Sequence, residues 1–228
     1  MIPYPRIIAH RCGGALAPEN SLAGLEAAAR LGCRAVEFDV MLTADGAPIL
    51  MHDETLERTT RCTGRVAERT LAEIRACDPA VPTLDEALAT CRRLALWTNI
   101  ELKPSAGCEA ETGEIVGRRL AALWDGRGVV SSFSEKSALA GRQHLPDAAF
   151  ALLCERLPDD WPAACARVGA RGVHVSAEGI TPENAVALRL AGMPVAVYTV
   201  NDPAAAERLF SLGITAIFTD RPQLWFSE

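Results

Sequence analysis

The sequence lacks the features that would suit it to a nucleic acid, a membrane or secretion. Its 228 residues carry 23 Lys plus Arg against 29 Asp plus Glu, a net charge of −6, so the basic excess that attracts polynucleotides or anionic lipids is missing. No uninterrupted apolar run approaches the ~20 residues that a membrane-spanning helix needs. The N-terminus shows no basic stretch followed by an apolar segment, so no signal peptide is indicated. We expect no nucleic-acid partner, no membrane insertion and a cytoplasmic location.

Several catalytic and nucleotide-binding motifs are also missing. There is no GxGxxG, no P-loop, no GxSxG elbow and no HExxH. The sequence therefore lacks the parts of a dinucleotide or nucleotide site, an acyl-hydrolase site and a zinc-protease site. It also shows no heptad pattern, so it defines no oligomeric state.

The eight cysteines form no CxxC pair. Several stand singly on apolar faces, where Cys behaves as a small hydrophobic residue. A chain of this length without an export signal is expected to keep its cysteines reduced. Cys12 lies beside Arg11 and the predicted metal site, so it is the candidate for a redox-sensitive cysteine.

Short strand-like runs alternate with helical stretches along the whole chain. The strand candidates are Arg6–His10, Ala35–Val40, Leu96–Leu102, Val129–Phe133, Ala149–Cys154, Gly172–Ser176, Pro194–Val200 and Ala216–Thr219. Helical periodicity is typical of Ser21–Leu31, Leu84–Leu94, Glu111–Trp124, Pro182–Ala191 and Pro203–Leu212. Eight strands alternating with helices predict an α/β fold, a (β/α)8 TIM barrel of minimal size. A doubly wound open sheet is the competing architecture, because periodicity does not show whether a sheet closes.

One segment departs from the strict alternation. After the strand Ala35–Val40, the chain Met41–Asp53 contains a turn at Ala44–Ala47 and a second strand-like run at Pro48–Met51. We interpret this as an excursion at the carboxyl end of the strand. The predicted organisation is a single domain over residues 1–228, with a short insertion around residues 41–82.

Acidic residues stand where two buried strands are expected. Because strand side chains alternate, Glu37 and Asp39 share one face, and Asn99, Glu101 and Lys103 share the corresponding face of a later strand. Strands of a parallel sheet are buried on both faces, so charges there need partners. Three carboxylates at adjacent strands suit a hard divalent cation such as Mg²⁺ or Ca²⁺. The alternative is a buried ion-pair cluster in which Lys103 neutralises one acid.

Two histidines follow strand ends, where ligands bind in barrels and open sheets. His10 is followed by Arg11, and His52 by Asp53. Two imidazoles can take a proton on one side of a reacting centre and return one on the other, while an Arg fork suits a phosphate. His174 is assigned either to the barrel mouth or to a wall.

Taken together, the ordered motifs resemble the glycerophosphodiester phosphodiesterase family, closest to its short cytosolic bacterial members. The resemblance covers nearly the whole chain. It rests on His10-Arg11, Pro18–Ser21, Glu37–Val40, Leu42–Gly46, His52-Asp53, Glu101–Pro104, Ser131–Phe133, Val197–Asn201 and Thr219–Pro222.

The resemblance implies a role for each matching residue. The metal ligands match Glu37, Asp39 and Glu101, and the acid/base histidines match His10 and His52. Phosphate contacts match Arg11 and Lys103, and aromatic or apolar walls of the substrate site match Tyr198 and Phe133. The implied activity is hydrolysis of a small-molecule glycerophosphodiester, such as glycerophosphocholine or glycerophosphoethanolamine, to glycerol 3-phosphate and an alcohol, with one divalent cation, Mg²⁺ or Ca²⁺, as cofactor.

Alternatives remain at four points. The attacking oxygen is either water or the neighbouring glycerol hydroxyl, and either histidine can be the base. The stretch Ala76–Pro82 is shorter than its counterpart in the family, which would admit a larger group, so a phosphodiesterase of lysophospholipids or another glycerol-linked diester is the second enzymatic hypothesis. A barrel that only binds a phosphorylated metabolite, or a metal-dependent lyase or isomerase, fits the retained acids and histidines less well.

Overall fold

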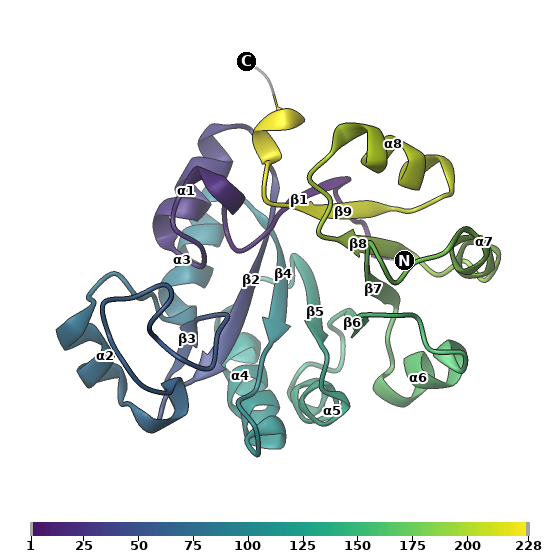
Figure 1. Cartoon of the computed structure of the whole chain (residues 1–228). Coiled ribbons are helices and arrows are strands. Elements are labelled where there is room, and N and C mark those ends of the chain that lie inside the picture. The colour runs from purple at the N-terminus through teal and green to yellow at the C-terminus, as the bar shows by residue number, and fades with distance from the viewer. Residues whose placement is uncertain (1, 227–228) are drawn as a thin grey trace.

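The computed structural model describes residues 2–226 and contains a closed barrel of eight parallel strands (Figure 1). The barrel strands are β1 (Ile7–Ala9), β2 (Ala35–Leu42), β4 (Trp97–Leu102), β5 (Gly128–Ser132), β6 (Phe150–Cys154), β7 (Gly172–Ser176), β8 (Val195–Tyr198) and β9 (Ala216–Thr219). They follow one another in chain order around the barrel, and β1 pairs with both β2 and β9. This double pairing closes the sheet, so the predicted TIM barrel is confirmed and the open sheet is excluded.

Helices lie outside the strand ring. They are α1 (Leu22–Arg30), α3 (Leu84–Leu94), α4 (Glu109–Leu123), α5 (Glu135–His144), α6 (Trp161–Val168), α7 (Pro182–Leu190) and α8 (Pro203–Ser211). Short 3₁₀ helices cover Gly14–Leu16, Val66–Glu68 and Pro222–Leu224. Local sequence explains the boundaries: the hydroxyl of Thr83 and the carboxylate of Glu86 form a capping box at the start of α3, and Thr181 caps α7.

The interior of the barrel changes character along its axis. The inward positions near the amino ends of the strands are apolar, among them Ile8, Ala35 and Trp97, and the ring of Tyr4 packs 5.5 Å from that of Trp97. Two residues further along β2 and β4, the inward positions are Glu37 and Asn99, and these are followed by Asp39 and Glu101. The polar groups thus gather at the carboxyl end of the barrel, where barrel enzymes place their sites.

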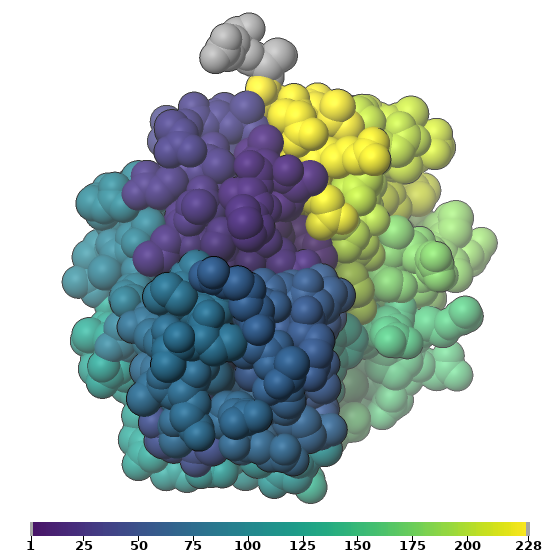
Figure 2. Space-filling model, turned by 60° about the vertical axis from the view of Figure 1, so that its left-hand side comes forward, coloured from purple at the N-terminus to yellow at the C-terminus, as the bar shows by residue number. Residues whose placement is uncertain are grey.

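The excursion after β2 is a compact unit of its own. Strand β3 (Pro48–Leu50) runs antiparallel to β2, and helix α2 (Leu71–Cys77) follows before α3. Its buried side chains form a separate small core: Met41, Ile49, Met51, Leu56, Cys62, Val66, Ile74 and Val81. Figure 2 shows this insertion, in blue, lying against the purple segment that follows β1.

One disulfide cross-links the insertion. Cys62 and Cys77 are bonded, with their Cα atoms 5.7 Å apart at a sequence separation of 15, while the other six cysteines are free. The expectation that all eight stay reduced is therefore wrong for this pair. The fold of the insertion places the end of α2 beside the loop at Cys62. The spacing of the cysteines in the sequence did not predict this proximity.

We expect the cross-link to contribute about 3 kcal/mol to the free energy of unfolding, the value of the chain-entropy model for a loop of this size. Urea unfolding of the wild type against the Cys62→Ala/Cys77→Ala double variant measures the difference. Alkylation of the denatured, unreduced protein should modify six cysteines, and all eight after reduction. Eight modified cysteines before reduction would contradict the pairing.

Candidate active site

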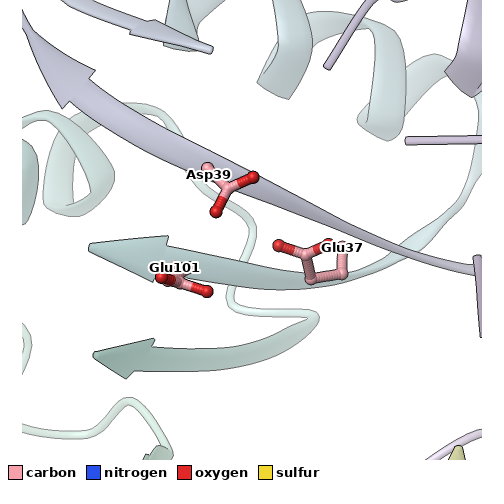
Figure 3. Close-up of side chains that lie close together, drawn as sticks. All are labelled: Glu37, Asp39 and Glu101. Carbon is pink, nitrogen blue, oxygen red and sulfur yellow. The ribbon is translucent and has the colours of Figure 1, made fainter. Parts of the chain in front are cut away.

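Three buried carboxylates converge at the carboxyl end of β2 and β4 (Figure 3). Asp39 stands opposite Glu101 in the register of the two strands, and Glu37 lies one inward position earlier on β2. One oxygen from each residue lies within 4.8 Å of the others. The exposed fractions of the three residues are 3%, 2% and 9% for Glu37, Asp39 and Glu101. This is the cluster expected from the sequence.

The triad is short of positive charge. Glu37 Oε2 accepts a 2.8 Å hydrogen bond from the backbone N–H of Arg11, and Asp39 Oδ2 accepts one of 2.9 Å from Asn20 Nδ2. Lys103 Nζ lies 3.3 Å from Asp39 Oδ1 and 3.6 Å from Glu101 Oε1. Among residues 2–226, Glu37 Oε1 and Glu101 Oε1 find no hydrogen-bond partner. Lys103 and Arg11, whose Nε lies 3.9 Å from Asp39 Oδ2, supply two positive charges for three buried acids, so an ion-pair cluster alone is an incomplete account.

The shortage of positive charge also shows in the raised pKa values of two of the acids. Burial raises the pKa of Glu37 to about 7, and the neighbouring Asp39 adds to the effect. Burial, again reinforced by Asp39, raises the pKa of Glu101 well above its ordinary value. A divalent cation with oxygen ligands would satisfy both unpartnered oxygens and the excess negative charge. The chemistry of these donors therefore fits a metal ion.

The two predicted histidines line the same cavity as the triad, which has a volume of about 430 Å³. His10, directly after β1, places Nδ1 2.7 Å from Asp220 Oδ1 and Nε2 3.8 Å from Glu37 Oε2. His52, two residues after β3, places Nδ1 2.7 Å from Asp53 Oδ1. A carboxylate only accepts, so in each histidine Nδ1 carries the hydrogen-bonded proton and Nε2 is left for other chemistry.

The environments of the two imidazoles differ. Burial alone would lower the pKa of His10, but its hydrogen bond to Asp220 and the nearby Glu37 outweigh burial and raise it. Burial is also the largest influence at His52, and there the pKa stays lowered. The hydrogen bond from His10 in turn lowers the pKa of Asp220 to about 2.

The cationic and aromatic candidates also reach this cavity. Its lining includes Arg11, Lys103, Phe133 and Tyr198 together with the triad, the two histidines, Asn99, Leu153, Glu155, His174, Thr199 and Phe218. The guanidinium of Arg11 donates to Glu19, while its buried Nε lies 3.9 Å from Asp39 Oδ2 and lacks a hydrogen-bond partner among the described residues. The Phe133 and Tyr198 rings meet edge to face at 6.2 Å, and Phe133 is 51% exposed. The tertiary structure thus brings all nine predicted site residues to one cavity.

Sequence reasoning assigned no role to several groups that support the site. Asp220 holds His10 and is itself held by Asn201 Nδ2 at 2.9 Å, and Asp53 holds His52. Asp220 follows β9 and Asn201 lies just beyond β8, so the rule that function lies at strand ends would have found them. Glu155, directly after β6, is an exposed acid with no ion pair in the described part of the chain.

The structure also locates His174, Cys12 and the shortened stretch before α3. His174 is fully buried inside the barrel, where it lines the main cavity and forms a 2.8 Å hydrogen bond with the Tyr4 hydroxyl, and burial lowers its pKa to about 3. Cys12 is fully buried, and burial raises the pKa of its thiol, which disfavours the reactive thiolate. Ala80, Val81 and Pro82 line a separate small cavity that also touches His52 and lie outside the main lining.

The barrel, the buried acids that suit a metal ion and the two carboxylate-bound histidines define a hydrolase-like (β/α)8 site. The family model of the glycerophosphoryl diester phosphodiesterase family matches residues 10–224, so the chain belongs to that family. The resemblance found in the sequence is confirmed. The protein is accordingly an enzyme, a hydrolase of glycerophosphodiesters.

Individual relatives match this chain along nearly their whole length. A glycerophosphodiester phosphodiesterase of Caldanaerobacter subterraneus subsp. tengcongensis is 30% identical over 230 residues, covering 95% of this chain and 94% of the relative. One of Bacillus altitudinis is 30% identical and covers 95% of each. The solved Oleispira antarctica phosphodiesterase OLEI02445, in complex with the product sn-glycerol-3-phosphate, superposes with a TM-score of 0.92 at 32% identity, covering 96% of this chain and 94% of that one. Within the described residues no helix combines the length and apolarity needed to cross a bilayer.

We expect metal affinity to weaken as the pH falls below about 7, because Glu37, with its pKa raised to about 7, then retains a proton that the cation must displace. Calorimetric titration with Mg²⁺, Ca²⁺ or Mn²⁺ at pH 6 and pH 8 should show roughly tenfold weaker binding per pH unit on the acid side. Glu101→Gln should lose binding, and the exposed Glu207→Gln should retain it. Affinity that is constant from pH 6 to pH 8 would contradict this account.

Proposed function

We propose that the enzyme cleaves glycerophosphodiesters to glycerol 3-phosphate and a free alcohol, with Glu37, Asp39 and Glu101 as ligands of one divalent cation. The observation that carries the proposal is the pair of histidines in the triad's cavity, each with Nδ1 bound to a carboxylate. The product bound by the Oleispira antarctica relative supports glycerol 3-phosphate as the retained part. All-oxygen ligands favour Mg²⁺ or Ca²⁺ as the cation.

The bound cation would polarise the non-bridging phosphate oxygens and offset charge in the transition state. Arg11 and Lys103 bind the phosphate beside it. The buried Nε of Arg11 has no hydrogen-bond partner in the described chain, and Lys103 reaches the cavity from the strand end that carries Glu101. These two cations explain how an acidic protein accepts an anionic diester.

The histidines transfer protons at Nε2. One removes the proton from the attacking oxygen, which belongs to water or to the neighbouring glycerol hydroxyl, and the other protonates the departing alkoxide. Asp220 and Asp53 hold the two rings by Nδ1, so that each Nε2 remains available.

Phe133, Tyr198 and Glu155 form the part of the cavity contributed by β5, β8 and β6, and we assign the leaving alcohol to it. Tyr198 donates to the Cys154 carbonyl at 2.9 Å, next to Glu155 in the chain. An unpaired carboxylate beside two aromatic rings favours a cationic alcohol such as choline or ethanolamine.

The deciding experiment is release of glycerol 3-phosphate from glycerophosphocholine, with EDTA and with Mg²⁺ or Ca²⁺ added back. We expect EDTA to abolish turnover and one of the ions to restore it. His10→Ala and His52→Ala should each lower kcat by about 10²–10⁴-fold, because each removes one proton-transfer group, while circular dichroism stays unchanged. Retention of turnover by both variants would contradict the acid/base assignment.

We expect Glu155→Gln to raise KM for glycerophosphocholine about two- to fivefold, the effect of one solvent-exposed charge contact. KM for the uncharged headgroup of glycerophosphoglycerol should stay constant, which makes that diester the internal control. An equal change for both diesters would place Glu155 outside the alcohol subsite.

A further inference from the structure

Arg58, in the insertion between β3 and α2, joins two carboxylates that come from different loops. Its Nη1 and Nη2 donate to Glu19 Oε2 and Oε1 at 2.8 and 2.7 Å, a two-pronged contact across 39 residues of sequence. The same guanidinium donates to Asp53, through Nη2 to Oδ1 at 3.0 Å and through Nε to Oδ2. The planar fork of Arg is suited to such a double contact.

Each of these acids contacts a residue of the active site. Asp53 Oδ1 lies 2.7 Å from Nδ1 of His52. Glu19 accepts from Arg11 Nη1 at 3.0 and 3.2 Å. Arg58 is therefore the centre of a chain of alternating charges with Arg11 at one end and His52 at the other. Arg58 itself is not among the residues that line the main cavity, so its influence passes through the two acids.

Stability alone is a poor explanation of this arrangement. The Arg58 side chain is 47% exposed, where an isolated ion pair contributes about 0–1 kcal/mol; a two-pronged contact in a charge network contributes more, but stability does not require that both acids contact active-site residues. Arg65 offers a comparison in the same insertion: its side chain is also 47% exposed and pairs with Glu54. Neither Arg65 nor Glu54 lines the main cavity. The two arginines match in exposure, and each pairs with two acids, since Arg65 also lies 4.0 Å from Glu68; only the acids bound by Arg58 contact active-site residues.

The charge state of Asp53 fits the same role. Hydrogen bonds from Arg58 hold the pKa of Asp53 well below its ordinary value. An ionised Asp53 keeps accepting from Nδ1 of His52, which fixes the tautomer with a free Nε2. Burial would raise the pKa of Glu19, but Arg58 and Arg11 lower it, so that acid also remains ionised.

We propose that Arg58 is a positioning residue that fixes the His52 ring through Asp53 and the Arg11 guanidinium through Glu19. The proposal rests on the roles of His52 and Arg11 in the proposed function. It couples the insertion to the loop after β1, the two segments that adjoin in Figure 2. The insertion thereby contributes the orientation of both a proton-transfer group and a phosphate-binding group.

The test compares steady-state kinetics of Arg58→Ala and Arg65→Ala with the wild type, using glycerophosphocholine and saturating metal. Arg58→Ala should lower kcat/KM about 10–100-fold, the usual cost of losing an orienting partner, with kcat reduced and KM raised. Asp53→Asn should act mainly on kcat, and Glu19→Gln mainly on KM. Arg65→Ala should stay within twofold of the wild type, and both arginine variants should melt at closely similar temperatures.

A double-variant cycle separates positioning from general damage. In the Asp53→Asn background the link to His52 is already broken, so Arg58→Ala should have little further effect on kcat and should still raise KM. The same fractional loss of kcat in both backgrounds would overturn the proposal, as would an Arg58→Ala enzyme within twofold of the wild type. If Arg58→Ala does not fold, Arg58→Lys keeps the charge without the fork, and wild-type kinetics in that variant would equally overturn it.

The outcomes also distinguish this proposal from the proposed function. A wild type that turns over no glycerophosphodiester with any ion would refute the proposed function. An active, metal-dependent wild type with an unaffected Arg58→Ala variant would refute the positioning role alone.

Discussion

Three carboxylates buried at one end of an otherwise apolar barrel are the constraint on which the rest of the site depends. Glu37, Asp39 and Glu101 are held close together by the pairing of β2 with β4, and two of their oxygens lack a partner in the described chain. Such an arrangement is costly unless a cation is bound. The barrel tolerates it because Lys103, Asn20 and the Arg11 backbone each satisfy part of the cluster and leave the remainder for a metal ion.

The two histidines are held in the same way although their surroundings differ. His10 and His52 each give Nδ1 to an aspartate, and each aspartate is held by another side chain, Asn201 behind Asp220 and Arg58 behind Asp53. A ring fixed in this way has one tautomer and one orientation, which proton transfer requires. One support is a neutral amide and the other a charged guanidinium, so the two rings lie in different electrostatic environments.

The insertion does more than cover the barrel mouth. It supplies His52 and Asp53, has its own apolar core, and is stapled by the Cys62–Cys77 disulfide. Arg58 then binds it to the loop after β1 through Glu19. A segment that carries a proposed catalytic group on loops needs such anchoring, because exposed loops are otherwise the least rigid part of a fold.

Much of this molecule follows from local sequence. Period-two alternation in β2 and β4 put Glu37, Asp39 and Glu101 on inward faces, and residues at strand ends identified His10 and His52, since both rules depend only on neighbours in the chain. The sequence by itself thus determined the alternation of eight strands with helices, the acids and the histidines. Only the tertiary structure decided the closure through β1, the Cys62–Cys77 bond and the partners Asp220 and Arg58. These contacts join residues from 15 to 210 positions apart, and no local periodicity encodes which distant side chains a folded chain brings within hydrogen-bonding distance.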